Sequence, residues 1–206
     1  MIRHTRPFVV AAALLLVAPA AAGAQEKPTP EEIARLQAMM MEAMAPGPEH
    51  ERLARFAGRW TTESRVWPEP GAQPMVASGT AANRMILGGR FLLSESATPA
   101  GPMRGEAMMI LGFDRRNGWY TSAAYDTYGT YGVMARGGYD AARGAIVMSG
   151  EDTVASAGHT QTWDFALREV EADTFVFEII FTDPAHTRGG APFKMVEVTY
   201  RRAGGS

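Results

Sequence analysis

The chain has 206 residues, with 22 glycines, 13 prolines and no cysteine, and its formal net charge at pH 7 is −2. This length suits one domain with short appendages, and the glycine and proline content is typical of many short strands joined by turns. The absence of cysteine excludes disulfides, thiolate metal sites and a lipid anchor on an N-terminal cysteine. Because the charge is not positive, we expect no nucleic-acid partner.

The first 24 residues have the composition of a secretory signal peptide. Arg3 and Arg6 give a basic start, residues 8–19 are almost wholly apolar, and residues 22–24 (Ala-Gly-Ala) form a small-x-small cleavage site. The apolar run is shorter than the roughly 20 residues of a membrane span, so we expect none here. We predict cleavage after Ala24 and a periplasmic or secreted protein. Loss of Arg3 and Arg6, two of the 20 basic residues, changes the net charge from −2 to −4.

Residues 25–47 are predicted to be a helical leader. Residues 29–32 (Thr-Pro-Glu-Glu) form a capping box with proline at the first helical position. Apolar residues then recur at helical spacing: Ile33, Leu36, Met40, Met41 and Met44. The stripe predicts a spacer helix, and the alternative is an interaction module in which the methionine-rich helix docks on a partner, because methionine adapts to varied surfaces. A second short helix is predicted over residues 48–57.

From Trp60 onward, apolar residues alternate with a period of two, which predicts β-strands. The ten predicted strands cover residues 60–66, 75–86, 90–96, 103–113, 119–126, 130–139, 145–151, 160–167, 174–182 and 193–202. The Gly88-Gly89 pair predicts a two-residue hairpin turn with positive φ at both glycines. Because no helical pattern interrupts the series, we predict an all-β fold, an antiparallel up-and-down barrel of about ten strands preceded by one or two short helices.

The two ends of the strand series differ in side-chain size. The inward faces of the first two strands carry small and polar residues, whereas the ninth strand presents several phenylalanines on one face. Such uneven filling predicts a cavity, in which a small, mostly apolar ligand binds. The predicted ligand-binding residues are Trp60, Asn83, Met85, Tyr125, Asp126, Trp163 and Phe177.

Six segments resemble a known bacterial family: residues 47–50 (Gly-Pro-Glu-His), Gly58-x-Trp60, residues 83–93, residues 112–114 (Gly-Phe-Asp), residues 137–140 and the closing residues 197–202. Their order is similar to that of DUF1579, a family of unknown function, over about residues 47–203. The resemblance implies a calycin-like barrel, similar to lipocalins and nitrobindins, over residues 48–203, followed by a tail at 204–206. It also implies that Trp60 packs against Arg202 of the last strand. It supplies no catalytic residues.

Three individual residues suggest other functions. Asp126 ends the fifth strand, where it either lies paired in a barrel mouth or caps a turn as an Asx residue. Asp126 or Glu106 as a general acid or base predicts an enzyme on the same scaffold. His159 opens a strand and is the one histidine placed for nitrobindin-like haem binding. Because neither a nucleophile motif nor paired metal-ligand spacing is present, we assign no catalytic residue and predict no cofactor or metal.

Overall fold

The computed structural model describes residues 27–156 and 158–204. The predicted signal peptide, residues 1–24, lies outside this range. The chain divides into two compact units between residues 38 and 39. Among the helices in the described part of the chain, none has the length and hydrophobicity that a membrane span requires.

Helix α1 (Pro30–Met44) begins with the predicted capping box. The Thr29 backbone N–H donates to Glu32 Oε2 at 2.7 Å, and the Glu32 backbone N–H donates to Thr29 Oγ1 at 3.2 Å. The two bonds satisfy backbone donors that a helix start leaves unpaired. The apolar stripe of α1 is exposed along its length, at Ile33, Leu36, Met40, Met41 and Met44.

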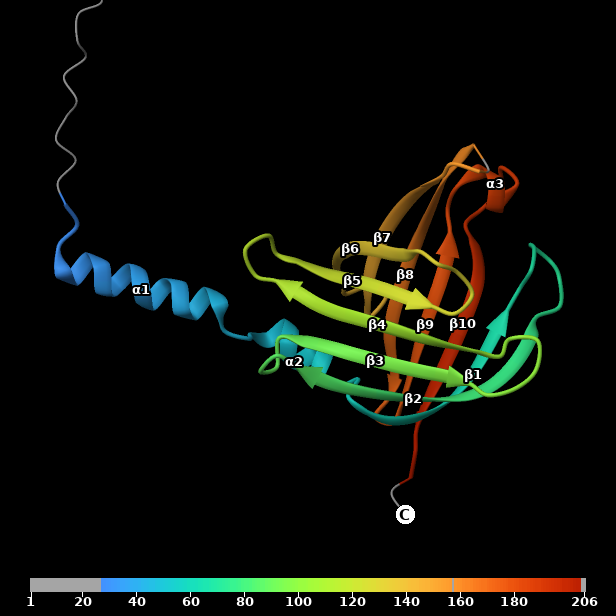
Figure 1. Ribbon diagram of the computed structural model, residues 1–206, viewed down its shortest axis with the longest axis horizontal. Coiled ribbons are helices and arrows are strands. Elements are labelled where there is room, and N and C mark those ends of the chain that lie inside the picture. Colours follow the sequence, from blue (N-terminus) through green and yellow to red (C-terminus); the bar gives the residue numbers. More distant parts are fainter. Residues whose placement is uncertain (1–26, 157, 205–206) are drawn as a thin grey trace, which may run out of the picture. The chain divides into compact units, whose positions relative to one another are not determined.

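The second unit is a closed barrel in which every strand pairs antiparallel with its neighbours in sequence and β1 pairs with β10 (Figure 1). In Figure 1 the strands β2–β5 run across the direction of β8–β10. The strands are β1 (Gly58–Val66), β2 (Met75–Ile86), β3 (Phe91–Thr98), β4 (Gly105–Asp114), β5 (Trp119–Asp126), β6 (Gly132–Asp140), β7 (Ala145–Val154), β8 (His159–Glu171), β9 (Thr174–Phe181) and β10 (Phe193–Arg202). The predicted all-β up-and-down barrel is confirmed.

The turn between β2 and β3 differs from the prediction. Ile86 pairs with Phe91, so the loop has four residues, 87–90, and not two. The backbone N–H groups of Gly89 and Arg90 both donate to the Ile86 carbonyl at 3.1 Å. Leu87, Gly88 and Gly89 all have positive φ, at 49°, 66° and 82°. The glycine pair identified the turn, but a left-handed leucine before it is sterically unfavourable and could not be predicted from sequence.

A short helix lies at each end of β9. Phe56, which follows helix α2 (Pro48–Ala54), is buried and packs edge-to-face on Phe175 with ring centroids 5.0 Å apart. At the other end His186 of helix α3 (Pro184–Thr187) stacks on Phe181 at 3.9 Å. Phe181 is six residue steps along the strand from Phe175, or about 20 Å. Helix α2 was predicted to run to residue 57, and no helix was predicted between the strands at 174–182 and 193–202, where α3 lies.

The barrel closes around a contact between its first and last strands. The Arg202 guanidinium lies 4.3 Å from the centroid of the Trp60 ring, as the family resemblance implied. Arg202 also donates to Asp173 Oδ1 at 2.7 Å and to the Ala57 carbonyl at 3.2 Å. Gly58 has a φ of 140°, and a Cβ at this position would lie 2.4 Å from Arg202 Nη1. The backbone conformation therefore favours glycine here, and a Cβ would in addition require the Arg202 guanidinium to shift.

We expect Gly58→Ala to lower the free energy of unfolding by about 1–3 kcal/mol, because the backbone becomes strained and Arg202 is displaced. Gly138→Ala is the matched control: no described atom lies within 4 Å of a Cβ there, and alanine in a strand is about 0.5–1 kcal/mol more favourable than glycine. Urea unfolding of both variants measures the difference. Equal stability of the two variants would contradict the role assigned to Gly58.

Candidate functional site

A groove of about 540 Å³ crosses the outer face of strands β1–β5. Two neighbouring cross-strand rows of outward side chains line it. One row follows the pairs Arg59–Ala82, Ala82–Glu95, Glu95–Met108 and Met108–Tyr125. The other follows the pairs Thr61–Thr80, Thr80–Ala97 and Ala97–Glu106. The groove is outside the barrel because these residues alternate with the inward-facing Trp60 and Ala81.

The groove has small residues in the middle and larger ones toward its ends. Thr80, Ala82 and Ala97 form the centre, and the partly exposed side chains of Met108 and Tyr125 stand toward the β5 end. Five strands spaced by about 4.8 Å make the groove about 19 Å long. It can therefore hold an elongated molecule with an apolar middle.

Charged groups of opposite sign stand at the two ends of the groove. Arg59 lies at the β1 end, whereas Glu106 and Asp126 lie at the β4–β5 end. Glu95, between them, forms a salt bridge with Arg84 at 3.3 Å, and both side chains are more than half exposed. Such an exposed pair contributes little to stability. The groove therefore has a basic and an acidic end.

The barrel interior contains a much smaller void, of about 20 Å³. Its lining includes Asn83, Phe177 and Tyr200. The Asn83 amide donates to the Phe56 carbonyl at 2.9 Å. This volume suits one water molecule and is too small for an organic ligand of the predicted class.

Part of the interior is filled by large side chains that face small ones. Trp163 on β8 pairs with Gly150 on β7, where a Cβ would lie 2.7 Å from the indole. Ala135 and Ser122 face the interior on the next two strands, and both are buried. The uneven filling expected from the sequence is real, but the bulky residues occupy the space that the small ones leave.

A second cluster of polar side chains lies at the α3 end of the barrel. His159, Asp183 and His186 carry metal-ligand atoms that all lie within 4.8 Å of one another. Burial of Asp183 would by itself raise its pKa, but hydrogen bonds from His186 and the backbone outweigh burial and lower the pKa. The carboxylate is therefore ionised at neutral pH.

Comparison with protein families assigns the chain. The model of DUF1579, described as a protein of unknown function, matches residues 45–202. The chain belongs to the DUF1579 family. No curated protein sequence matches it significantly.

In this DUF1579 protein the seven predicted ligand residues fall into three places. Tyr125 belongs to an outward row of the groove, whereas Trp60 and Asp126 belong to the inward-facing row that borders it. Asn83 and Phe177 line the internal void. Met85 and Trp163 belong to the core of the barrel.

Asp126 takes the turn role among the alternatives considered. Its Oδ1 accepts a hydrogen bond from the Tyr128 backbone N–H at 2.8 Å, as in an Asx turn. Asp126 and Glu106 are both exposed. Neither lies in the dry pocket that the acid–base hypothesis requires.

The surroundings of His159 differ from those expected for a haem ligand. A buried carboxylate and a second imidazole lie close to it, where a haem face would need apolar contacts.

The sequence did not reveal the groove, because its rows are formed by register between strands. The alternation along each strand did indicate that Ala82, Glu95 and Met108 point outward.

Tyr200 gives the interior a measurable pH dependence. Burial raises the pKa of Tyr200 to about 12, compared with 10.0 for a free tyrosine. The neutral phenol therefore stabilises the fold fully below pH 10. This contribution, up to about 3 kcal/mol, is lost as the pH rises from 10 to 12.

We expect Tyr200→Phe to lose less unfolding free energy than the wild type between pH 8 and pH 11.5 in urea titrations. Tyr131→Phe, at an exposed position, should behave as the wild type. Equal pH slopes for Tyr200→Phe and wild type would contradict the assignment.

Proposed function

We propose that this protein is exported and binds a small, mostly apolar molecule with an anionic end, held in the outer groove and not in the barrel interior. The observation that carries the proposal is volume: about 540 Å³ in the groove against about 20 Å³ in the internal void. Small-molecule sites occupy roughly 300–1,000 Å³. The signal-peptide pattern of residues 1–24 supports export.

The polarity of the groove supports a particular orientation of the ligand. An anionic group is attracted to Arg59 at the β1 end and repelled by Glu106 and Asp126 at the opposite end. The apolar body then covers Ala82 and Ala97 and reaches Met108, where burial of apolar surface contributes about 25 cal/mol per Å². The groove is open to water, so we expect modest affinity and fast release.

We expect Ala82→Trp to weaken binding of the anionic amphiphile anilinonaphthalene sulfonate by about tenfold or more, equivalent to 1.4 kcal/mol, because the indole fills the centre of the groove. Ala82 is exposed, so the fold tolerates the larger side chain. Ser78→Trp is the matched control on the same face of the same strand, outside the groove. Fluorescence titration measures both. Equal loss in the two variants, or none in Ala82→Trp, would remove the groove from consideration.

A second titration tests the orientation. We expect Arg59→Gln to weaken the binding of anilinonaphthalene sulfonate by about twofold to fivefold, because an exposed charge pair contributes up to about 1 kcal/mol. The neutral N-phenylnaphthylamine should bind Arg59→Gln and wild type alike. The exposed Arg104, outside the groove lining, supplies the control Arg104→Gln, which should bind both probes as the wild type does. If the binding of the neutral probe is weakened equally, Arg59 acts through its shape and not its charge, and the proposed anionic end of the ligand is wrong.

A further inference from the structure

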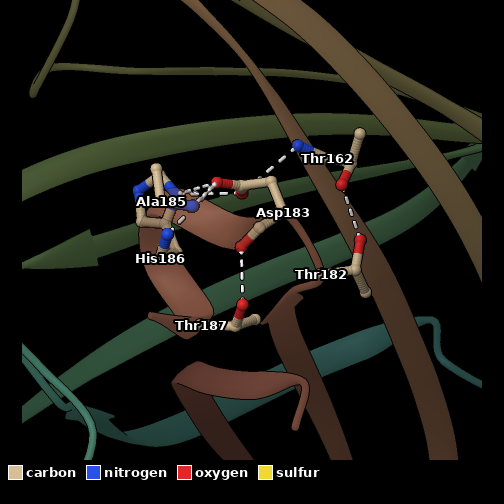
Figure 2. A network of polar contacts seen from close by, with 6 residues as sticks. All are labelled: Thr162, Thr182, Asp183, Ala185, His186 and Thr187. Atoms are coloured by element: carbon tan, nitrogen blue, oxygen red, sulfur yellow. Dashed lines mark hydrogen bonds and ion pairs between the residues drawn. The ribbon is translucent and has the colours of Figure 1, made fainter. Parts of the chain in front are cut away.

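The connection between β9 and β10 holds a buried carboxylate in one fixed position. Asp183 caps α3: its Oδ1 accepts from the backbone N–H groups of Ala185 and His186, both at 3.1 Å (Figure 2). Its Oδ2 lies 3.4 Å from the Thr162 backbone N–H on β8. The Asp183 side chain is 3 % exposed. These contacts leave the carboxylate little freedom to rotate.

His186 is held beside this carboxylate from two sides. Its Nδ1 lies 2.9 Å from Asp183 Oδ2 and 3.0 Å from Oδ1. Its ring stacks on Phe181 with 3.9 Å between centroids and an angle of 17° between planes. The stack fixes the plane of the imidazole. The His186 side chain is 25 % exposed, so solvent can reach the ring edge.

His159 comes to the same place from a different element. It is the first residue of β8, and its ring centroid lies 6.3 Å from that of His186. The helix cap accounts for Asp183 and for its contact with His186, but the cap does not involve His159. The barrel thus brings two imidazoles and one ionised carboxylate together from separate segments.

We propose that His159, Asp183 and His186 form a binding site for a divalent transition-metal ion, for which Zn²⁺ is the natural probe. Two histidines and one carboxylate are a ligand set that binds Zn²⁺ or Fe²⁺ and leaves at least one coordination position for water or another ligand. Bonds of about 2.0–2.2 Å place tetrahedral ligand atoms about 3.4 Å apart. The three ligand atoms, now within 4.8 Å of one another, reach this spacing with shifts of about 1 Å.

The bound ion would join the start of β8 to the β9–β10 connection. The three ligand residues lie on β8 and in the β9–β10 connection, about 20 Å along β9 from its α2 end, whereas the outer groove lies on β1–β5. The metal site is therefore independent of the proposed ligand groove, and either can fail while the other holds.

The test uses the purified chain without an affinity tag, stripped with chelator and titrated with Zn²⁺ by calorimetry. We expect one Zn²⁺ per chain with micromolar or tighter affinity, and a higher melting temperature in its presence, because the ion binds the folded state. His159→Ala should weaken binding by about 100-fold or more, since even indirect metal contacts account for 10–100-fold. His159→Cys, which replaces one ligand with another, should retain most of the affinity.

Two further measurements separate ligation from other effects. Asp152→Asn removes an exposed charge from the neighbouring strand β7 without removing a ligand, and should bind Zn²⁺ as the wild type does. Co²⁺ in place of Zn²⁺ should give visible absorption bands of a four-coordinate site, and His159→Ala should abolish them. No saturable one-to-one binding, or unchanged binding by His159→Ala while circular dichroism shows a folded barrel, would overturn the proposal.

Discussion

The antiparallel pairing of the first strand with the last is the constraint on which the rest of the fold depends, because a barrel open at this seam would expose two unpaired strand edges. At one end of the seam the Arg202 guanidinium lies over the ring of Trp60. The same tryptophan donates its indole N–H to the Phe56 carbonyl at 3.1 Å, which also accepts from Asn83. The seam therefore positions the residue that follows α2 and, with it, one end of the barrel. Gly58 allows this arrangement, because a Cβ at this position would lie against the Arg202 guanidinium.

Closure of this kind leaves little space inside. Trp163 lies over Gly150, and Phe175 stacks on Tyr200 with 4.1 Å between ring centroids. Close packing of large against small side chains stabilises the barrel, and the internal void beside Asn83 and Phe177 is only about 20 Å³. The proposed ligand site is therefore on the outside, where five strands form a shallow surface with small residues in its middle. An outer groove also has a different functional consequence: ligand exchange needs no opening of the barrel.

The two candidate sites use different physical principles. The groove on β1–β5 offers apolar area between charges of opposite sign, so its selectivity is for length and polarity. The cluster at α3 offers three donor atoms held by a helix cap, an aromatic stack and a strand end, so its selectivity is for an ion. Rigid positioning of a carboxylate before a ligand arrives reduces the ordering cost of binding. The Asp183 cap provides that rigidity whatever occupies the site.

The sequence alone determined the fold class and the strand number, because alternation with period two and turn residues such as Gly88-Gly89 are local signals. The contact between Trp60 and Arg202 was implied by the family resemblance. The sequence also placed Trp60, Asn83 and Phe177 on inward faces. The tertiary structure alone decided the size of the void and the position of the groove. Both depend on which residues pair across strands, and a pairing such as Trp163 with Gly150 cannot be deduced from the sequence of either strand. The same holds for His159, which looked isolated in sequence because its neighbours, Asp183 and His186, reach it only through the β8–β9 hairpin and the α3 turn.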